Sequence, residues 1–467
     1  MMLIKKIFLL TSLFFLFHSI NFSQKNQEIR AVWIATNHRL DWPPPTFDIE
    51  VQKKSLIEIF DSIKSKNLNT IYFQVRSNGT VLFNSSFEPC SFYIDGKGNL
   101  PYDPLQFAIQ EAHKRGIEIH AWLNVVQVFA GGELDILNNP DHIVKRKPDW
   151  IIEYQENEMK SYWLNPAIPE VREYISDLIK ELVKNYNVDG IHLDYIRYPG
   201  RNFNDDSLFN IYGKGLSKDN WRRKNITDLI ELINKKIKSV KPYVKLGATP
   251  IGIYKNHSGM SGWEGYNDVY QDAREWLKRG LLDYIVPQVY WSIENNFEVI
   301  TREWVNNSFG KNVIIGIGAF KDDIKSKIEK MIEYTRTIGA QGFAIFRYSS
   351  IKDYKFQNFL DNKTSTVNRK EQDENEIFEP VNFSLMNSNF LKPVLIKKSK
   401  DNFDVIIFSE TEDEVMLKGS NDTDEEIIIT TKIKSGKNLI ELKSDLSRYK
   451  EILLIFLSSN KMMKLKM

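Results

Sequence analysis

Polar and ionisable side chains end several short hydrophobic runs in the middle of the chain. Asp194 lies in the run VDGIHLDYIRYP, and His192 stands two residues before it, on the same face of an extended strand. A carboxylate in this position can serve as a nucleophile, as an acid or as a clamp on a ligand. Three other runs carry polar side chains with the same alternation: Gln74 and Arg76, then His120, Trp122 and Asn124, and finally Gln288 and Tyr290.

Hydrolysis of a glycosidic bond normally uses two carboxyl groups about 5 to 9.5 Å apart, one protonated and one ionised. Asp194 is the only carboxylate of its run on this face, so a second acid must come from another segment. We favour Asp272, at the start of a predicted helix, followed by Glu264, in a loop rich in Gly and Trp. A carboxylate at a helix start also has a purely structural explanation, as a cap. Further candidates are Asp41, Asp268 and Glu294.

Arginines and aromatic rings near these runs are candidates for holding a saccharide. Arg76 and Arg197 can donate several hydrogen bonds to sugar hydroxyls or to an acidic substituent, or can pair with Asp194 and keep it ionised. Trp and Tyr rings offer flat faces to pyranose rings, although Tyr195 has the parity of the outward set. The predicted substrate-binding residues are Gln74, Arg76, His120, Trp122, Asn124, His192, Arg197, Tyr198, Gln288, Tyr290 and Trp291.

Metal-dependent hydrolysis is the main chemical alternative. His120, His192 and Asp194 could form a site of two histidines and one carboxylate that lowers the pKa of a bound water. However, no His-x-His pair lies on the first strand-like run and no His-Glu-x-x-His motif occurs. A Gly-x-Ser-x-Gly elbow is also missing, and Cys90 is the single cysteine. We therefore expect no metal and no cofactor.

The elements that must position these residues form a regular alternation of strands and helices. Eight β-branched or aromatic runs alternate with segments of helical spacing, several of which close on Gly. This pattern predicts a parallel (β/α)8 TIM barrel, with the polar side chains at its C-terminal mouth. A doubly wound open sheet is less favoured, because no glycine-rich phosphate turn follows the first run. The runs begin at Glu28, Asn69, Ile117, Val188, Val244, Leu282, Asn312 and Ala340.

The two ends of the chain differ from this middle part. Residues 1–23 have two lysines followed by a short apolar stretch, which is typical of a cleaved signal peptide; an uncleaved anchor is the alternative. The barrel is predicted over residues 28–361, and the polar segment 362–385 is interpreted as a linker. Short β-rich runs over residues 386–467 predict a small C-terminal all-β, sandwich-like domain.

Composition limits the partners of the 467-residue chain. Lys and Arg number 63 against 61 Asp and Glu, a formal net charge of +2, so the basic surface needed for nucleic acids is not expected. Hydrophobic residues at 42% exclude wholly disordered chains. After signal cleavage we expect an exported protein with no stable membrane insertion.

Long motifs of the middle part resemble the glycosyl hydrolase-like 10 family of bacterial exported proteins. They include EIRAVWIATNHRLDWPPP, LNPAIPEVREYI, VDGIHLDYIRYPG and LDYIVPQVYW, within residues 28–350. The resemblance implies a TIM barrel. It also implies a polysaccharide substrate and a location in the periplasm, on the cell surface or outside a Gram-negative bacterium, since a characterised division-site member from such bacteria cuts peptidoglycan glycan strands that have lost their stem peptides. Motif positions of the family map onto the predicted binding residues other than Arg197, and onto Asp194 and Asp272.

One departure from the family pattern concerns the second acid. Many members carry His-Phe-Asp-Asp, whereas this chain has His192-Leu193-Asp194-Tyr195. Asp272, Glu264 or an N-acetyl oxygen of the substrate must then take the second role. The predicted function is that of an exported glycoside hydrolase acting on cell-wall glycan, most of all peptide-free peptidoglycan strands. The alternatives are a non-catalytic glycan-binding protein and, less favoured, a metal-dependent polysaccharide hydrolase or deacetylase.

Overall fold

The chain consists of two compact units, residues 1–371 and 372–467. The computed structural model describes residues 28–356 except 132–133 and 157–158, and residues 394–465 except 400–401, 410–412, 422–423, 434–435, 444–445 and 458–460. The predicted signal peptide and linker lie outside the described residues.

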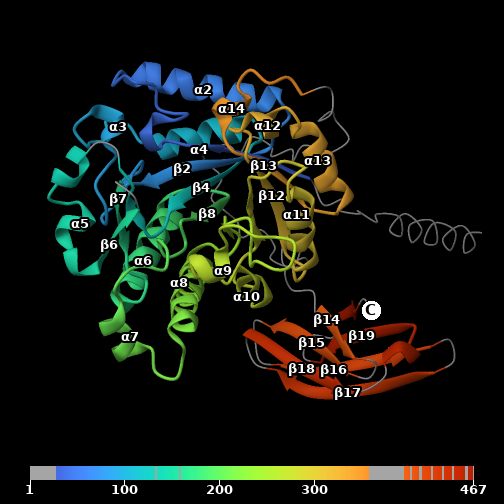
Figure 1. Cartoon of the computed structure of the whole chain (residues 1–467). Coiled ribbons are helices and arrows are strands. Elements are labelled where there is room, and N and C mark those ends of the chain that lie inside the picture. Colours follow the sequence, from blue (N-terminus) through green and yellow to red (C-terminus); the bar gives the residue numbers. More distant parts are fainter. Residues whose placement is uncertain are drawn as a thin grey trace, which may run out of the picture. The chain divides into compact units, whose positions relative to one another are not determined.

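The first unit is a closed barrel of eight parallel strands, as predicted (Figure 1). Closure follows from the first strand, which pairs with both the second strand and the last. A closed barrel leaves no free edge on this sheet. The strands, in chain order, are β1 (Ile29–Ile34), β2 (Thr70–Ser77), β4 (Glu118–Asn124), β8 (Gly190–Asp194), β9 (Lys245–Ala248), β10 (Tyr284–Ile285) continued by β11 (Gln288–Val289), β12 (Asn312–Ile317) and β13 (Gly342–Ile345).

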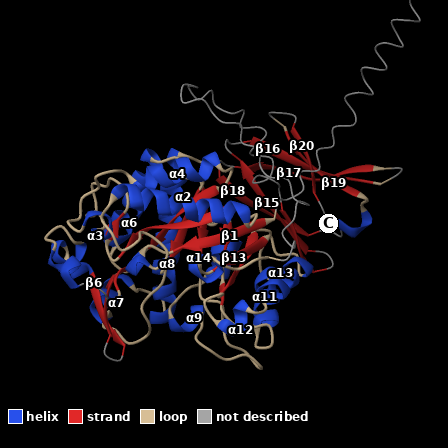
Figure 2. Ribbon diagram, turned by 90° about the horizontal axis from the view of Figure 1, so that it is seen from above, coloured by secondary structure: helices blue, strands red, loops and turns tan. Residues whose placement is uncertain are grey.

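Helices surround these strands, as Figure 2 shows for β1 and β13. Their apolar residues recur at helical spacing, and the side chains of that face are buried against the barrel. Asp48 and Asp103 accept hydrogen bonds from the first turns of the first two long helices, so these starts are defined by N-caps. The main helices are α2 (Ile49–Ser65), α4 (Pro104–Lys114), α6 (Pro169–Asn185), α8 (Lys218–Val240), α10 (Ala273–Lys278), α11 (Phe297–Asn306) and α13 (Ile328–Thr337).

Additional short elements extend the loops after the barrel strands. The longest insertion, after β4, forms a small antiparallel sheet in the order β5-β7-β6. Its strands are β5 (Gln127–Phe129), β6 (Ile151–Glu156) and β7 (Met159–Leu164). The other elements are β3 (Thr80–Val81) and the helices α3 (Phe92–Asp95), α5 (Ile143–Arg146), α7 (Asp206–Tyr212), α9 (Gly265–Asp268), α12 (Asp322–Lys325) and α14 (Tyr348–Ile351).

The barrel interior is packed with large rings opposite glycines. An added Cβ at Gly190 would lie 2.5 Å from His120 Nδ1, and one at Gly247 would lie 2.1 Å from the ring of Tyr284. Both distances are far below normal van der Waals contact. These two glycines on β8 and β9 therefore provide the space that the rings of the neighbouring strands fill.

The second unit consists of two antiparallel sheets around one small core, which confirms the predicted all-β fold. Val405 and Leu442 of one sheet share this core with Leu417 and Ile452 of the other. In neither unit is a described helix long and apolar enough to cross a membrane. The sheets are β14 (Val394–Ser399), β15 (Asn402–Ser409) and β18 (Gly436–Lys443), and β17 (Glu425–Ile433), β16 (Asp413–Ser420), β19 (Glu451–Phe456) and β20 (Lys461–Leu465).

Candidate active site

Asp194 is the last residue of β8, at the C-terminal end of the barrel, and its side chain is held by three donors. One carboxylate oxygen accepts from the Tyr195 backbone N–H at 2.7 Å and from Gln288 Nε2 at 3.4 Å, and the other accepts from Trp122 Nε1 at 3.2 Å. Asp194 is only 7% exposed. Burial raises its pKa to about 6, although the donors and Arg197 favour the ionised form.

The backbone turns sharply directly after this carboxylate. Tyr195 has a φ of 49°, in the left-handed region that costs a non-glycine residue about 1–2 kcal/mol. The turn directs the Tyr195 N–H to the Asp194 side chain, while the Asp194 carbonyl accepts from Val125 N at 2.7 Å. Strain of this kind is concentrated at functional sites, where surrounding contacts hold it in place.

Two clusters of aromatic rings include or surround groups that interact electrostatically with Asp194, and we call this set of six rings the aromatic mouth. The charge of Asp194 acts on Arg197, and burial together with the same charge raises the pKa of Tyr290. Trp263 and Phe320 are each 50% exposed. Sequence reasoning did not single out Trp163, Phe320 or Phe346, although the latter two lie near the ends of predicted strand-like runs. The members are Trp163, Tyr195 and Trp263 around Arg197, and Tyr290, Phe320 and Phe346 in mutual contact.

Gln74 and Asn124, both predicted to bind substrate, form a linked pair at the same end of the barrel. Gln74 Nε2 donates to Asn124 Oδ1 at 3.0 Å, and Gln74 Oε1 accepts from the backbone N–H groups of Thr36 and Asn37. Both side chains are buried. Their hydrogen bonds fix the loop after β1 against β4.

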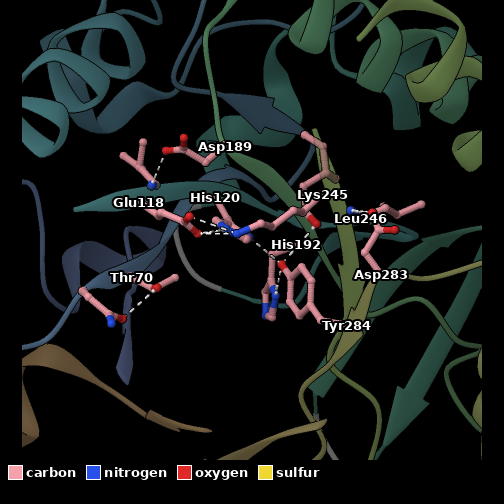
Figure 3. Close-up of polar contacts among 12 residues, drawn as sticks. Thr70, Glu118, His120, Asp189, His192, Lys245, Leu246, Asp283 and Tyr284 are labelled. Carbon is pink, nitrogen blue, oxygen red and sulfur yellow. Dashed lines mark hydrogen bonds and ion pairs between the residues drawn. The ribbon is translucent and has the colours of Figure 1, made fainter. Parts of the chain in front are cut away.

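His120 and His192 lie deeper, inside the barrel, which corrects the prediction that they contact substrate (Figure 3). The Tyr284 hydroxyl lies 2.7 Å from His120 Nδ1 and 3.3 Å from His192 Nδ1. Trp33 Nε1 donates to His192 Nε2 at 3.0 Å. Burial and the neighbouring His120 hold the pKa of His192 well below its usual value, so this ring is neutral.

The proposed site of two histidines and one carboxylate is not formed. His192 uses both ring nitrogens in internal hydrogen bonds, and Asp194 is held by Trp122 and Gln288 instead. Within the described parts of the chain, no group of three or more His, Cys, Asp or Glu side chains is arranged to hold a metal ion.

Arg76 does not reach the mouth, which also corrects a prediction. A β-bulge shifts the register so that Gln74 pairs with Trp122 but Arg76 pairs with Leu123, and the alternation of side chains reverses after Gln74. Arg76 therefore points out of the barrel, against Ile175 and its neighbours on α6. There its guanidinium pairs with the buried Glu88, at 2.5 and 2.7 Å.

Tyr198 and Trp291 have structural surroundings. Tyr198 is fully buried, stacks on Phe203 at 5.2 Å and accepts a hydrogen bond from Asn225, so the prediction of a sugar-stacking ring is wrong. Trp291 is partly buried beside Gly252 and Gly262. It supports the loop that carries Trp263.

Neither favoured partner carboxylate shares a hydrogen-bonding partner with Asp194. Asp272 accepts from the Tyr254 hydroxyl at 2.8 Å and caps α10, the structural role that its position also allowed. Glu264 is 2% exposed, caps α9 and accepts from Asn256 N and from Asn267. The remaining candidates are also engaged, Asp41 with Arg347, Asp268 with Arg201 and Glu294 with Lys327.

A cavity of about 210 Å³ lies at the other end of the barrel. Its lining includes Thr70, Glu118 and Lys245, which begin strands β2, β4 and β9. TIM-barrel chemistry takes place at the C-terminal strand ends, whereas the N-terminal ends serve stability. We therefore take the end of the barrel that carries Asp194, and not this cavity, as the candidate active site.

Residues 28–336 match the family described as Glycosyl hydrolase-like 10. The chain belongs to this family. This chain is 36% identical over 339 residues to Glycosyl hydrolase DigH of Escherichia coli K12. The match covers 66% of this chain and 76% of that protein. This chain is also 36% identical over 316 residues to Glycosyl hydrolase YngK of Bacillus subtilis, covering 63% of this chain and 61% of that protein.

A solved structure agrees with the fold of this glycosyl hydrolase-like 10 protein. The glycoside hydrolase domain of PgaB (BpsB) from Bordetella bronchiseptica matches with a TM-score of 0.51 at 14% identity, over 70% of this chain and 96% of that domain. At this identity the likeness concerns the fold alone. Together, family and relatives identify the chain as a glycoside hydrolase.

Proposed function

We propose that this glycoside hydrolase is exported and cleaves a cell-wall glycan, namely peptide-free peptidoglycan strands, with Asp194 as the proton donor. The observation that carries the proposal is Asp194 itself, a buried carboxyl whose pKa is raised to about 6. Arg197 and the rings of the aromatic mouth offer contacts to a chain of sugars. The choice of glycan rests on the family resemblance.

The proposed reaction uses the substrate for the second role. Asp194 transfers its proton to the glycosidic oxygen as that bond breaks, and the carbonyl oxygen of the neighbouring N-acetyl group bonds to the anomeric carbon. Water then opens the ring so formed and returns a proton to Asp194. This route is supported by the other engagements of Asp272 and Glu264.

The test of the function is the release of new reducing ends from purified, peptide-free glycan strands. Binding of the strands without product would favour the alternative of a non-catalytic glycan-binding protein. Export is tested separately, by sequencing the N-terminus of the mature protein from the cell envelope. A chain that keeps residues 1–23 in the cytoplasm would contradict that part of the proposal.

Replacement of Asp272 by Asn is expected to leave kcat within about threefold, since Asn also caps helices well. If Asp272 were instead the second acid or base, the variant would lose about 10²–10⁴-fold. Comparing kcat for this variant and for Glu264→Gln on the same strands decides between the carboxylates and the N-acetyl group.

Activity is expected to fall as the pH rises through about 6, because Asp194 must be protonated to act as an acid. The measurement is kcat/KM on glycan strands from pH 4.5 to 8. A profile that instead rises through pH 6 would show that the ionised carboxylate is the active form and that the assigned role is reversed.

Trp122→Phe is expected to move this falling limb to higher pH. The substitution removes the indole N–H that stabilises ionised Asp194, so the pKa of the carboxyl rises further. Trp33→Phe is the matched control, because Trp33 donates to His192 and not to Asp194. An unmoved limb in Trp122→Phe, or the same movement in both variants, would contradict the positioning role of Trp122.

A further inference from the structure

Arg197 is a cation whose charge acts on Asp194, and its surroundings are aromatic. Its guanidinium carbon lies 4.8 Å from the ring centre of Trp163 and 5.0 Å from those of Tyr195 and Trp263. Its Nη1 donates to the carbonyl oxygen of Tyr198 at 3.0 Å. Flat contacts with rings hold the guanidinium plane while leaving its edge available for hydrogen bonds.

Three other arginines of the barrel are paired with carboxylates. Arg76 pairs with Glu88 at 2.5 Å, Arg222 with Asp205 at 2.6 Å, and Arg347 with Asp41 at 2.9 Å. Among the residues that the structure describes, no carboxylate lies within 4.0 Å of the Arg197 guanidinium.

The Arg197 guanidinium is largely removed from water without a paired carboxylate in the described part of the chain. Burial lowers the pKa of Arg197, and the neighbouring Tyr195, Asp194 and Glu156 offset that effect only in part. A desolvated cation without a counter-ion is costly unless a ligand supplies the charge. The guanidinium fork suits a carboxylate, which it can bind through two parallel hydrogen bonds.

We propose that Arg197, framed by Trp163, Tyr195 and Trp263, is a subsite for a carboxylate borne by a sugar of the substrate. This inference rests on the proposed function and makes it more specific. In peptidoglycan the N-acetylmuramic acid residues carry a lactyl group whose carboxyl is joined to the stem peptide by an amide bond. Removal of the peptide frees the carboxylate, so the subsite selects strands that have lost their peptides.

The proposed subsite distinguishes peptide-free strands from strands with stem peptides by charge and by size. An amide in place of the carboxylate has no net charge to compensate Arg197, and the attached peptide must fit beside the three rings. Specificity of this kind combines a favourable contact with the correct ligand and a penalty for the wrong one. Arg197 thereby determines which strands bind, while Asp194 takes part in cleavage of the glycosidic bond.

The decisive experiment compares two forms of one substrate. Peptide-free strands are prepared as such, and a second portion has its lactyl carboxyl groups chemically reduced to alcohols. For the wild-type enzyme we expect kcat/KM to be roughly 10- to 100-fold lower on the reduced strands, mainly through KM, because a charge-assisted contact is lost. Arg197→Gln should treat both strands alike.

Two further variants keep the test decisive. Arg201→Gln is the matched control, because Arg201 is exposed and pairs with Asp268, and it should retain the wild-type preference. Arg197→Lys keeps the positive charge and should retain a weaker preference. If Arg197→Gln does not fold, Arg197→Lys and the wild-type comparison provide the readout.

The outcomes separate the two proposals. Equal cleavage of both strands by the wild type would overturn the carboxylate subsite and leave the hydrolase function intact. Cleavage of neither strand would overturn the proposed function, and the subsite with it. A preference that survives in Arg197→Gln would assign the recognition to another residue.

Discussion

Asp194→Asn is expected to lower kcat on peptide-free glycan strands by about 10²–10⁴-fold, because an amide cannot donate the proton that the leaving oxygen requires. The amide has nearly the same shape, and Trp122 and Gln288 remain beside it. KM should therefore change little. The measurement is the rate of appearance of reducing ends with saturating strands, and a fully active variant would remove Asp194 from the mechanism.

The same substitution separates loss of chemistry from loss of fold. The pKa of Asp194 is about 6 in the folded protein against an ordinary value of 3.8, so between these values the folded state holds a proton that the unfolded state releases. Wild-type stability therefore falls as the pH rises through this window, by roughly 3 kcal/mol in total. Asp194→Asn has no buried carboxyl group to ionise, so its free energy of unfolding in urea should exceed that of the wild type at pH 8. At pH 5 the difference between the two proteins should be smaller. A variant less stable than the wild type at pH 8 would contradict the raised pKa.

Arg76→Met is expected to destabilise the barrel by about 3–5 kcal/mol, because it leaves Glu88 buried without its cation. The Glu88 side chain is inaccessible to solvent, and the hydroxyl of Tyr174 would be its remaining donor. Urea or thermal unfolding measures the effect. The folded variant should keep the wild-type KM, since Arg76 lies outside the mouth.

The double variant Arg76→Met, Glu88→Leu is the control for that prediction. Replacement of both members removes the unpaired charge, so most of the lost stability should return. A stable Arg76→Met variant with a raised KM would instead restore the predicted substrate-binding role of Arg76.

Much of the barrel could be predicted because its signals are local and repeated. Alternation with a period of two marks the strands, helical spacing marks the segments between them, and eight repeats of this unit admit few topologies. The same alternation correctly placed Asp194, Trp122 and Gln288 at one end of the barrel, where Trp122 and Gln288 both donate hydrogen bonds to Asp194.

Where the backbone departs from regularity, the alternation gave wrong answers. The bulge between Gln74 and Arg76 reverses the direction of every later side chain on β2, and no residue type in that run signals it. The left-handed turn at Tyr195 similarly ends the alternation before Tyr198.

Contacts between residues far apart in the chain also could not be predicted from the sequence. Asp272 and Glu264 stand at helix starts, where a structural cap and a catalytic acid have the same residue type. The ion pair of Arg76 with Glu88 depends on how β2 and the following loop meet α6. Such contacts depend on tertiary packing and not on spacing.

The match of glycines to rings inside the barrel makes pairs of positions interdependent during evolution. A methyl group at position 247 has no room while Tyr284 is present, and Gly190 stands in the same relation to His120. A lineage that acquired alanine at either glycine would first need a side chain smaller than the present ring at the paired position on the neighbouring strand. Sequences of this family should therefore keep or exchange each pair together, and the order of substitutions should run from ring to glycine.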